Sequence, residues 1–165
     1  CAEKLVFAAA QTDGLVYIRT SRPKTKVLYP VTEEFPIGGS KVLRASAADR
    51  ATLIGAGVTL YEALEAHDLL KAQGIAVRVI DAYSIKPLDE ATIVKAAAET
   101  KFVVTVEDHS VNGGLGDAVC QAVAGRAPVK VLGVRKVPQS GAPKELMGVY
   151  GIDAKAVVAA VQERV

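Results

Sequence analysis

Four short apolar runs recur along the chain at nearly constant spacing, and this recurrence constrains the fold more than any other feature. The runs begin at residues 51, 77, 102 and 129. The interval of about 25 residues is the length of one β-strand plus a returning helix. Repeated βαβ units of this kind produce a sheet that is mostly parallel and buried on both faces. We therefore predict an α/β fold with three layers, α/β/α, around a mostly parallel sheet.

Helical segments with recognisable ends lie between these runs. The first is predicted to begin at a capping box formed by Thr59 and Glu62 and to end at the left-handed Gly74. Its apolar residues recur with helical period, which indicates that the helix packs on the sheet. The other predicted helices run from about 89 to 99, from near 114, and from 153 to 165.

Residues 1–36 depart from this pattern. The stretch "AEKLVFAAAQ" predicts a helix and "LVYIRT" a strand, and three prolines then interrupt regular structure. One helix and one strand cannot bury their own apolar faces. We therefore predict that residues 1–36 are the end of another domain plus a linker, and that residues 37–165 form a separate domain. The start at Cys1 fits a truncated or processed chain.

Composition excludes several classes of protein. The 20 basic and 18 acidic side chains nearly balance, which is not typical of a nucleic-acid binder. Cys1 and Cys120 lack the spacing of a metal or thiol redox site, so we expect a reducing, cytoplasmic setting. No apolar run reaches the roughly 20 residues that span a bilayer, so we expect a soluble protein that does not bind membranes.

The stretch "VEDHSVNGGLGDAV" (106–119) holds the densest group of reactive side chains. Glu107, Asp108 and His109 follow the third apolar run, at the sheet edge where open α/β sheets bind ligands. The glycines after them could bring the N–H groups of a helix N-terminus to an anion. A carboxylate beside a histidine can also transfer protons. The simpler interpretation is a strand-end turn in which Glu107 or Asp108 holds His109, and the sequence leaves these roles open.

The stretch "GAGVTL" (55–60) is similar to the start of a dinucleotide-binding fingerprint. Leu60 occupies the place of the third glycine, and no acidic residue is well placed for a ribose. We therefore interpret the glycines as steric requirements of a strand-to-helix turn.

Two arginines lie close together in "YIRTSRP" (17–23). Arg19 and Arg22 begin a group of four cations that ends at Lys26, and Glu33 and Glu34 follow it. One hypothesis is a solvated basic linker that pairs with this acidic patch. The other is a phosphate site, because a planar guanidinium beside a hydroxyl matches the oxygens of a phosphate.

Several stretches, taken together and in order, resemble the C-terminal part of transketolases, in particular the animal and archaeal type. They are "YIRTSRP", "LIGAGVTLYEAL", "IKPLD", "TVEDHSVNGGLGDAV" and "GVYGIDAKAVVAAV", and the resemblance covers essentially all 165 residues. It implies that residues 1–36 are the last helix and strand of a pyrimidine-binding domain plus a linker. Residues 37–165 would be the transketolase C-terminal domain.

The same resemblance implies a function in the pentose phosphate pathway. Transketolases transfer a two-carbon ketol unit from a ketose donor to an aldose acceptor, and the arginine of their TSR motif, here Arg22, binds the phosphate of the sugar. Thiamine diphosphate and its divalent metal, Mg or Ca, would be bound by regions absent from this chain. We therefore expect no catalytic, cofactor-binding or metal-binding residue in it, and no activity of the chain alone.

The resemblance also implies partners and leaves two alternatives. The chain would act with the rest of a transketolase polypeptide or with an N-terminal subunit, within a homodimer. One alternative is the β subunit of a 2-oxo acid dehydrogenase, and the other is a non-catalytic assembly or regulatory module.

Overall fold

A five-stranded, mostly parallel sheet forms the centre of the computed structural model, which describes residues 1–22 and 24–165. The strand order is β1-β3-β2-β4-β5. Strand β2 pairs in parallel with β3 and β4, β4 pairs in parallel with β5, and β1 runs antiparallel to β3. The strands are β1 (Lys41–Arg44), β2 (Ala51–Gly55), β3 (Val77–Asp81), β4 (Phe102–Ser110) and β5 (Val129–Val134).

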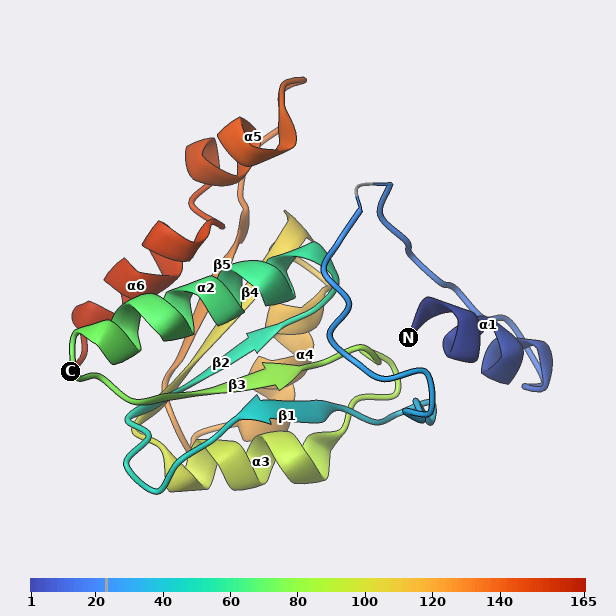
Figure 1. Ribbon diagram of the computed structural model, residues 1–165, viewed down its shortest axis with the longest axis horizontal. Coiled ribbons are helices and arrows are strands. Elements are labelled where there is room, and N and C mark those ends of the chain that lie inside the picture. The colour runs from blue at the N-terminus through green and yellow to red at the C-terminus, as the bar shows by residue number, and fades with distance from the viewer. Residues whose placement is uncertain (23) are drawn as a thin grey trace.

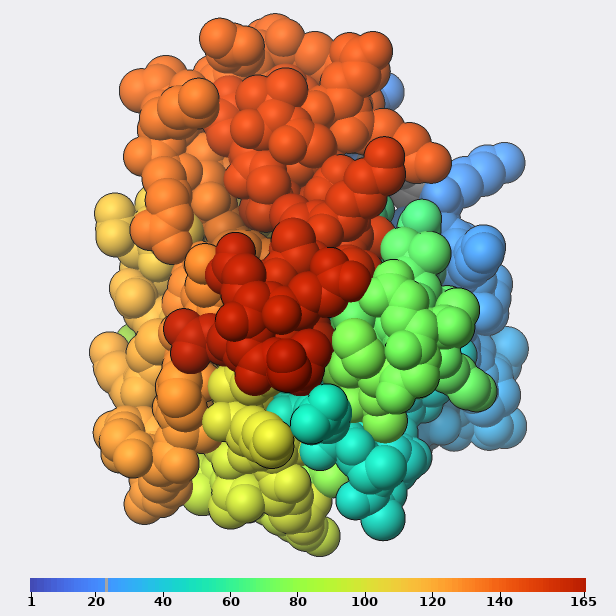
Figure 2. Space-filling model, turned by 90° about the vertical axis from the view of Figure 1, so that its left-hand side faces the viewer, coloured from blue at the N-terminus to red at the C-terminus, as the bar shows by residue number. Residues whose placement is uncertain are grey.

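Helices cover both faces of this sheet, which confirms the predicted three-layer α/β/α fold. Helices α2 and α6 pack on one face and α3 and α4 on the other (Figure 1). Figure 2 shows α6, in red, lying against α2, in green. The helices are α1 (Ala2–Ala10), α2 (Val58–Ala72), α3 (Glu90–Glu99), α4 (Leu115–Val123), α5 (Pro143–Val149) and α6 (Ala154–Gln162).

The apolar core lies on the two faces of the central strands. Every residue of β2 is buried, because this strand has neighbours on both edges and helices on both faces. Leu53 contributes to the cluster under α2 and α6, and Ile54 to the cluster under α3 and α4. Alternate residues of one strand therefore stabilise both helical layers.

The predicted helix ends are partly confirmed. Asp89 caps α3, Asp153 caps α6, and Gly74 has a φ of +76° just beyond α2. The predicted capping box is wrong. The N-cap of α2 is Gly57 and not Thr59, and no side chain at that position accepts a hydrogen bond from the first turn. Instead the hydroxyl of Thr59 donates a hydrogen bond to the carbonyl oxygen of Val106 on β4, at 2.7 Å. The sequence spacing drew attention to Thr59, but its partner is determined by the neighbouring strand β4.

Glu62, the other half of the predicted box, serves a different helix. Its Oε2 accepts a hydrogen bond from the backbone N–H of Ala154, at 2.8 Å, and so satisfies the first turn of α6. Burial raises the pKa of Glu62, and the bond from Ala154 opposes that rise. A side chain of α2 therefore fixes where α6 begins on the same face of the sheet.

The N-terminal segment differs from the prediction in one respect. Helix α1 forms as predicted, but residues 15–20 belong to no strand, and Leu15 and Tyr17 are largely exposed. A strand requires a neighbouring backbone to accept and donate its hydrogen bonds, and none of the described residues pairs with this run. Helix α1 itself buries no residue.

Among the described residues of the linker, Phe35 packs most closely. Phe35 is 3% exposed and lies edge-on against the rings of Tyr29 and Tyr83, with centroids 4.9 and 5.1 Å away. The hydroxyl of Tyr29 donates to Asp81 Oδ2 at 2.5 Å. These contacts attach residues 27–36 to the end of β3. None of the helices in the described residues is long and apolar enough to cross a bilayer.

Candidate functional site

The carboxyl ends of β2, β3 and β4 meet at one edge of the sheet. Gly55 is in register with Asp81 on one side and with Val106 on the other. The chain between α1 and β1 passes along this edge (Figure 1). The site predicted after β4 and the arginines of the N-terminal segment are therefore on the same side of the molecule.

Glu107 is the buried centre of this edge. Only 2% of its surface is exposed, and its carboxylate accepts hydrogen bonds from the backbone N–H groups of Leu115, at 2.7 Å, and Gly116, at 3.1 Å. Burial raises the pKa of Glu107, while the bonds from Gly116 and Leu115 and the nearby His109 oppose the rise. The sequence predicted that this helix N-terminus, the start of α4, could bind an anion, and the carboxylate of Glu107 occupies that position.

Three glycines leave the space that Glu107 fills. A Cβ atom at Gly114 would collide with the ring of His109 and the carboxylate of Glu107, and one at Gly116 would lie 2.8 Å from Glu107 Oε1. A Cβ atom at Gly133 would lie 3.0 Å from Glu107 Cγ. The glycine-rich loop therefore serves the packing of an internal carboxylate.

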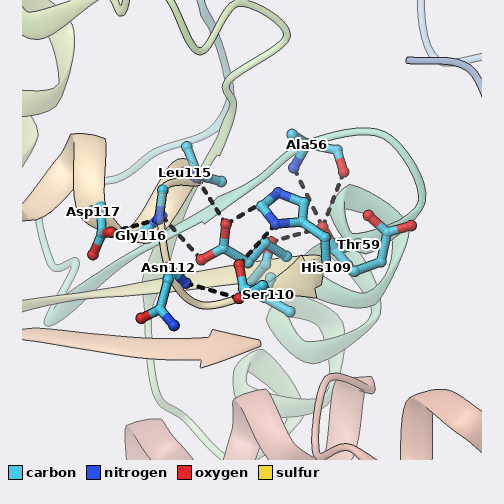
Figure 3. Close-up of polar contacts among 12 residues, drawn as sticks. Ala56, Thr59, His109, Ser110, Asn112, Leu115, Gly116 and Asp117 are labelled. Carbon is cyan, nitrogen blue, oxygen red and sulfur yellow. Dashed lines mark hydrogen bonds and ion pairs between the residues drawn. The ribbon is translucent and has the colours of Figure 1, made fainter. Parts of the chain in front are cut away.

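His109 is held against this carboxylate (Figure 3). Its Nε2 lies 3.2 Å from Glu107 Oε2, and its Nδ1 lies 2.8 Å from the carbonyl oxygen of Ser110. Because a carbonyl only accepts, the contact with Ser110 requires the hydrogen of the ring on Nδ1. This geometry agrees with the strand-end turn in which Glu107 holds His109.

Asp108, between them in sequence, points to the N-terminal segment. Its two carboxylate oxygens accept from the two terminal nitrogens of Arg19, at 2.6 and 2.9 Å. This bidentate bond is the main cause that raises the pKa of Arg19. The structure therefore joins two stretches that are 89 residues apart and that sequence analysis considered separately.

The hypothesis of a basic linker paired with Glu33 and Glu34 is not supported. Glu33 pairs with Lys41, and Glu34 pairs with Lys4 at 2.7 Å. Neither partner belongs to the cations of residues 19–26.

Arg22, the predicted phosphate-binding residue, is exposed. Within the described part of the chain, its guanidinium makes no hydrogen bond or ion pair, in contrast to Arg19. Four residues further along, the carbonyl oxygen of Lys26 accepts from the hydroxyl of Tyr61 on α2, at 2.7 Å. Arg22 thus lies, in sequence, between two points at which the segment is attached to the domain.

The glycines of "GAGVTL" have the steric role that was predicted for them. A Cβ atom at Gly55 would lie 2.9 Å from both the Cα and the backbone N of Leu60. Gly57 has a φ of +60°, a backbone conformation that other residues rarely adopt. The turn therefore requires glycine for reasons independent of any nucleotide.

The glycine-rich loop before α4 does not fit a diphosphate, and the described residues do not gather the ligands of a metal site. Nowhere in residues 1–22 and 24–165 do three His, Cys, Asp or Glu side chains converge to hold a metal ion. The N-terminus of α4, which is the helix end offered by the glycine-rich loop, already holds Glu107. A diphosphate would have to displace that buried carboxylate.

Comparison with known proteins identifies the family. The model of the family "Transketolase, C-terminal domain" matches residues 38–157. Transketolase-like protein 2 from Mus musculus is 51% identical over 167 residues, covering 99% of this chain and 26% of the relative. Transketolase from Homo sapiens is 48% identical over 163 residues, covering 97% of this chain and 26% of the relative. The chain thus spans about a quarter of the length of these curated relatives.

Two solved structures agree with this assignment. A split gene transketolase, described as an inactive beta4 tetramer, superposes with a TM-score of 0.91 at 39% identity, covering 97% of this chain and 53% of that one. Transketolase from Campylobacter jejuni superposes with a TM-score of 0.61 at 19% identity, covering 77% of this chain and 19% of that one, which is evidence for the fold alone. The chain therefore belongs to the transketolase C-terminal domain family.

Proposed function

We propose that this chain is the C-terminal part of a transketolase and that Arg22 binds the phosphate of its sugar substrate. The complete enzyme would move a two-carbon ketol unit from a ketose phosphate to an aldose phosphate. The family assignment supports the reaction class and favours it over that of a 2-oxo acid dehydrogenase. The observation that carries the role of Arg22 is the contrast between the two arginines: Arg19 is bound by Asp108, whereas Arg22 is exposed and its guanidinium bonds to none of the other described residues.

Arg22 has the chemistry that such a role requires. A guanidinium presents two parallel N–H donors, which match two oxygens of a phosphate. Its exposure leaves those donors available to a ligand that arrives from outside the domain. Binding the far end of the sugar would hold its carbonyl carbon in place for the reaction.

We propose that the chain is inactive without a second component. Thiamine diphosphate and its metal would be held by the preceding domains, either on the same polypeptide or on an N-terminal subunit. The inactive tetramer formed by β chains of a related split enzyme supports this view. Residues 1–36 would complete the preceding domain, since α1 buries none of its residues here.

Mixing experiments test the reaction. We expect no ketol transfer from this chain alone and transfer from a ketose phosphate to an aldose phosphate once the N-terminal component and cofactors are added. Turnover of 2-oxo acids instead, or no turnover in the mixture, would contradict the proposal.

Substitution of Arg22 tests its role. In the complete enzyme we expect Arg22→Ala to lower kcat/KM for a phosphorylated aldose about 10- to 150-fold, which corresponds to roughly 1.5 to 3 kcal/mol for a lost charge-assisted bond. The same aldose without its phosphate should be affected little. Lys24→Ala removes a neighbouring exposed cation and is the matched control. Equal kinetics for wild type and Arg22→Ala would rule out the phosphate site.

A further inference from the structure

We propose that Asp108 is a positioning residue for Arg22, which it controls by holding Arg19. This inference rests on the proposed function and extends it to a carboxylate that does not touch the substrate. Arg19 and Arg22 are three residues apart. The side chain of Arg19 attaches this stretch to the end of β4 through its two bonds with Asp108. The location of the exposed guanidinium would then depend on a residue at the end of β4.

Asp108 is itself held firmly because both of its neighbours are anchored. Glu107 accepts two hydrogen bonds at the start of α4, at 2.7 and 3.1 Å, and is 2% exposed. His109 is held between Glu107, at 3.2 Å, and the carbonyl oxygen of Ser110, at 2.8 Å. Asp108 lies between them in the irregular part of β4, where the register with β5 shifts, and its carboxylate bonds to Arg19. The two anchors restrict the backbone on both sides of Asp108 and so restrict where its carboxylate can lie.

The pair has the geometry of a specific contact. Both oxygens of Asp108 engage both terminal nitrogens of Arg19, an arrangement that restricts distance and orientation together. The side chains of Asp108 and Arg19 are 24% and 50% exposed, so water screens the pair partly, and its value here is in geometry more than in stability. A Lys at position 19 could not form the same two parallel bonds.

A second contact limits the segment beyond Arg22. The hydroxyl of Tyr61, on the first turn of α2, donates to the carbonyl oxygen of Lys26 at 2.7 Å. Three extended residues span at most about 10 Å, so a pair that restricts where Arg19 lies also restricts the backbone of Arg22 to a region within about that distance. Loss of the pair would free the segment on one side of Arg22 and let its guanidinium move by several ångströms. A displacement of about 1 Å is enough to weaken catalysis strongly when it affects a group that positions substrate.

The test uses the complete enzyme and two acceptors, a phosphorylated aldose and the same aldose without its phosphate. We expect Asp108→Ala and Asp108→Asn to raise KM for the phosphorylated aldose about 3- to 10-fold, less than Arg22→Ala does, because the guanidinium is displaced and not removed. The kinetics with the unphosphorylated aldose should not change. Glu65→Ala, an exposed acid on α2, controls for the change in net charge.

Double variants separate positioning from a direct or structural role. If Asp108 acts through Arg22, adding Asp108→Ala to Arg22→Ala should cause no further loss. The exchanged pair Arg19→Asp with Asp108→Arg should recover part of the lost affinity for the phosphorylated aldose. Circular dichroism and urea unfolding of each variant verify that the fold is retained.

The outcomes distinguish this inference from the function on which it rests. If Arg22→Ala has no effect, both fail. If Arg22→Ala impairs the enzyme while Asp108→Ala does not, the positioning role fails and the phosphate site remains. An effect of Asp108→Ala that persists without Arg22, or that is equal for both acceptors, also overturns the positioning role.

Discussion

At the scale of single residues, one buried carboxylate organises the candidate site. Glu107 accepts hydrogen bonds from two N–H groups of α4 and holds His109, and the residue between them, Asp108, binds Arg19. Glu107 is surrounded by glycines, and a Cβ atom at any of these positions would lie within 3.0 Å of its side chain. The trio of Glu107, Asp108 and His109 is thus mainly an anchor, and the residue that we propose to bind the sugar phosphate, Arg22, lies on a different segment.

Gly114→Ala tests the packing around Glu107. The added Cβ atom would collide with Glu107 and His109, so we expect a loss of about 1 to 3 kcal/mol in the free energy of unfolding. The matched control is Gly148→Ala in α5, where the nearest atom, Asp153 Oδ2, would be 3.6 Å from the new Cβ. Urea denaturation measures both variants. Equal stability of the two variants would show that the space around Glu107 is not restricted.

At the scale of secondary-structure elements, the side chains that satisfy the first turns of helices also bond to neighbouring elements. Asp89 begins α3 by accepting from the N–H of Thr92 at 3.1 Å and also accepts from the hydroxyl of Ser40, at 2.8 Å, next to β1. Glu62 of α2 does the same for α6. These bonds link neighbouring elements as well as satisfying helix ends.

Asp89→Ala tests the cap of α3. Burial raises the pKa of Asp89, but bonds from Ser40 and Thr92 outweigh it, so the pKa is lowered overall. A lowered carboxyl pKa adds stability above the unfolded value of about 3.9 and loses it as the pH falls through the folded value. We expect Asp89→Ala to lower the free energy of unfolding by about 1 kcal/mol at pH 7 and by less in strong acid.

Thermal or urea unfolding at several pH values gives this comparison. Glu90→Ala, at the next position and exposed, is the control and should change stability by no more than about 0.5 kcal/mol. A pH-independent difference between Asp89→Ala and wild type would contradict the charged cap.

At the scale of the whole molecule, the chain consists of a packed sheet and an N-terminal segment with little cover. Val6, Phe7, Leu15 and Tyr17 are exposed by between 52% and 107%. Residues 27–36, in contrast, contact the sheet through Tyr29 and Phe35. The proposed division at residue 36 therefore does not coincide with the change in packing, which lies before residue 27.

Truncation tests this division. Removing residues 1–26 should change the free energy of unfolding by less than about 1 kcal/mol, because it removes only exposed contacts. Removing residues 1–36 should cost about 3 to 5 kcal/mol, because it also removes the buried ring of Phe35. Chemical denaturation of the two shortened chains measures the difference. Equal stability would place the linker outside the folded domain.

Sequence alone determined the features that depend on neighbours along the chain. The four parallel strands, the helix beginnings at Asp89 and Asp153 and the end at Gly74 follow from local periodicity and local hydrogen bonding. The ordered motifs also identified the family, which the matching model confirms. The short edge strand β1 carried no such periodic signal and was missed.

Tertiary structure decided which distant groups meet. It left residues 15–20 without a strand partner, gave Thr59 and Glu62 partners on β4 and α6, and joined Arg19 to Asp108 across 89 residues. The physical reason is that a backbone or side-chain donor is satisfied by whichever acceptor the packing brings within about 3 Å, and that proximity is a property of the assembled sheet.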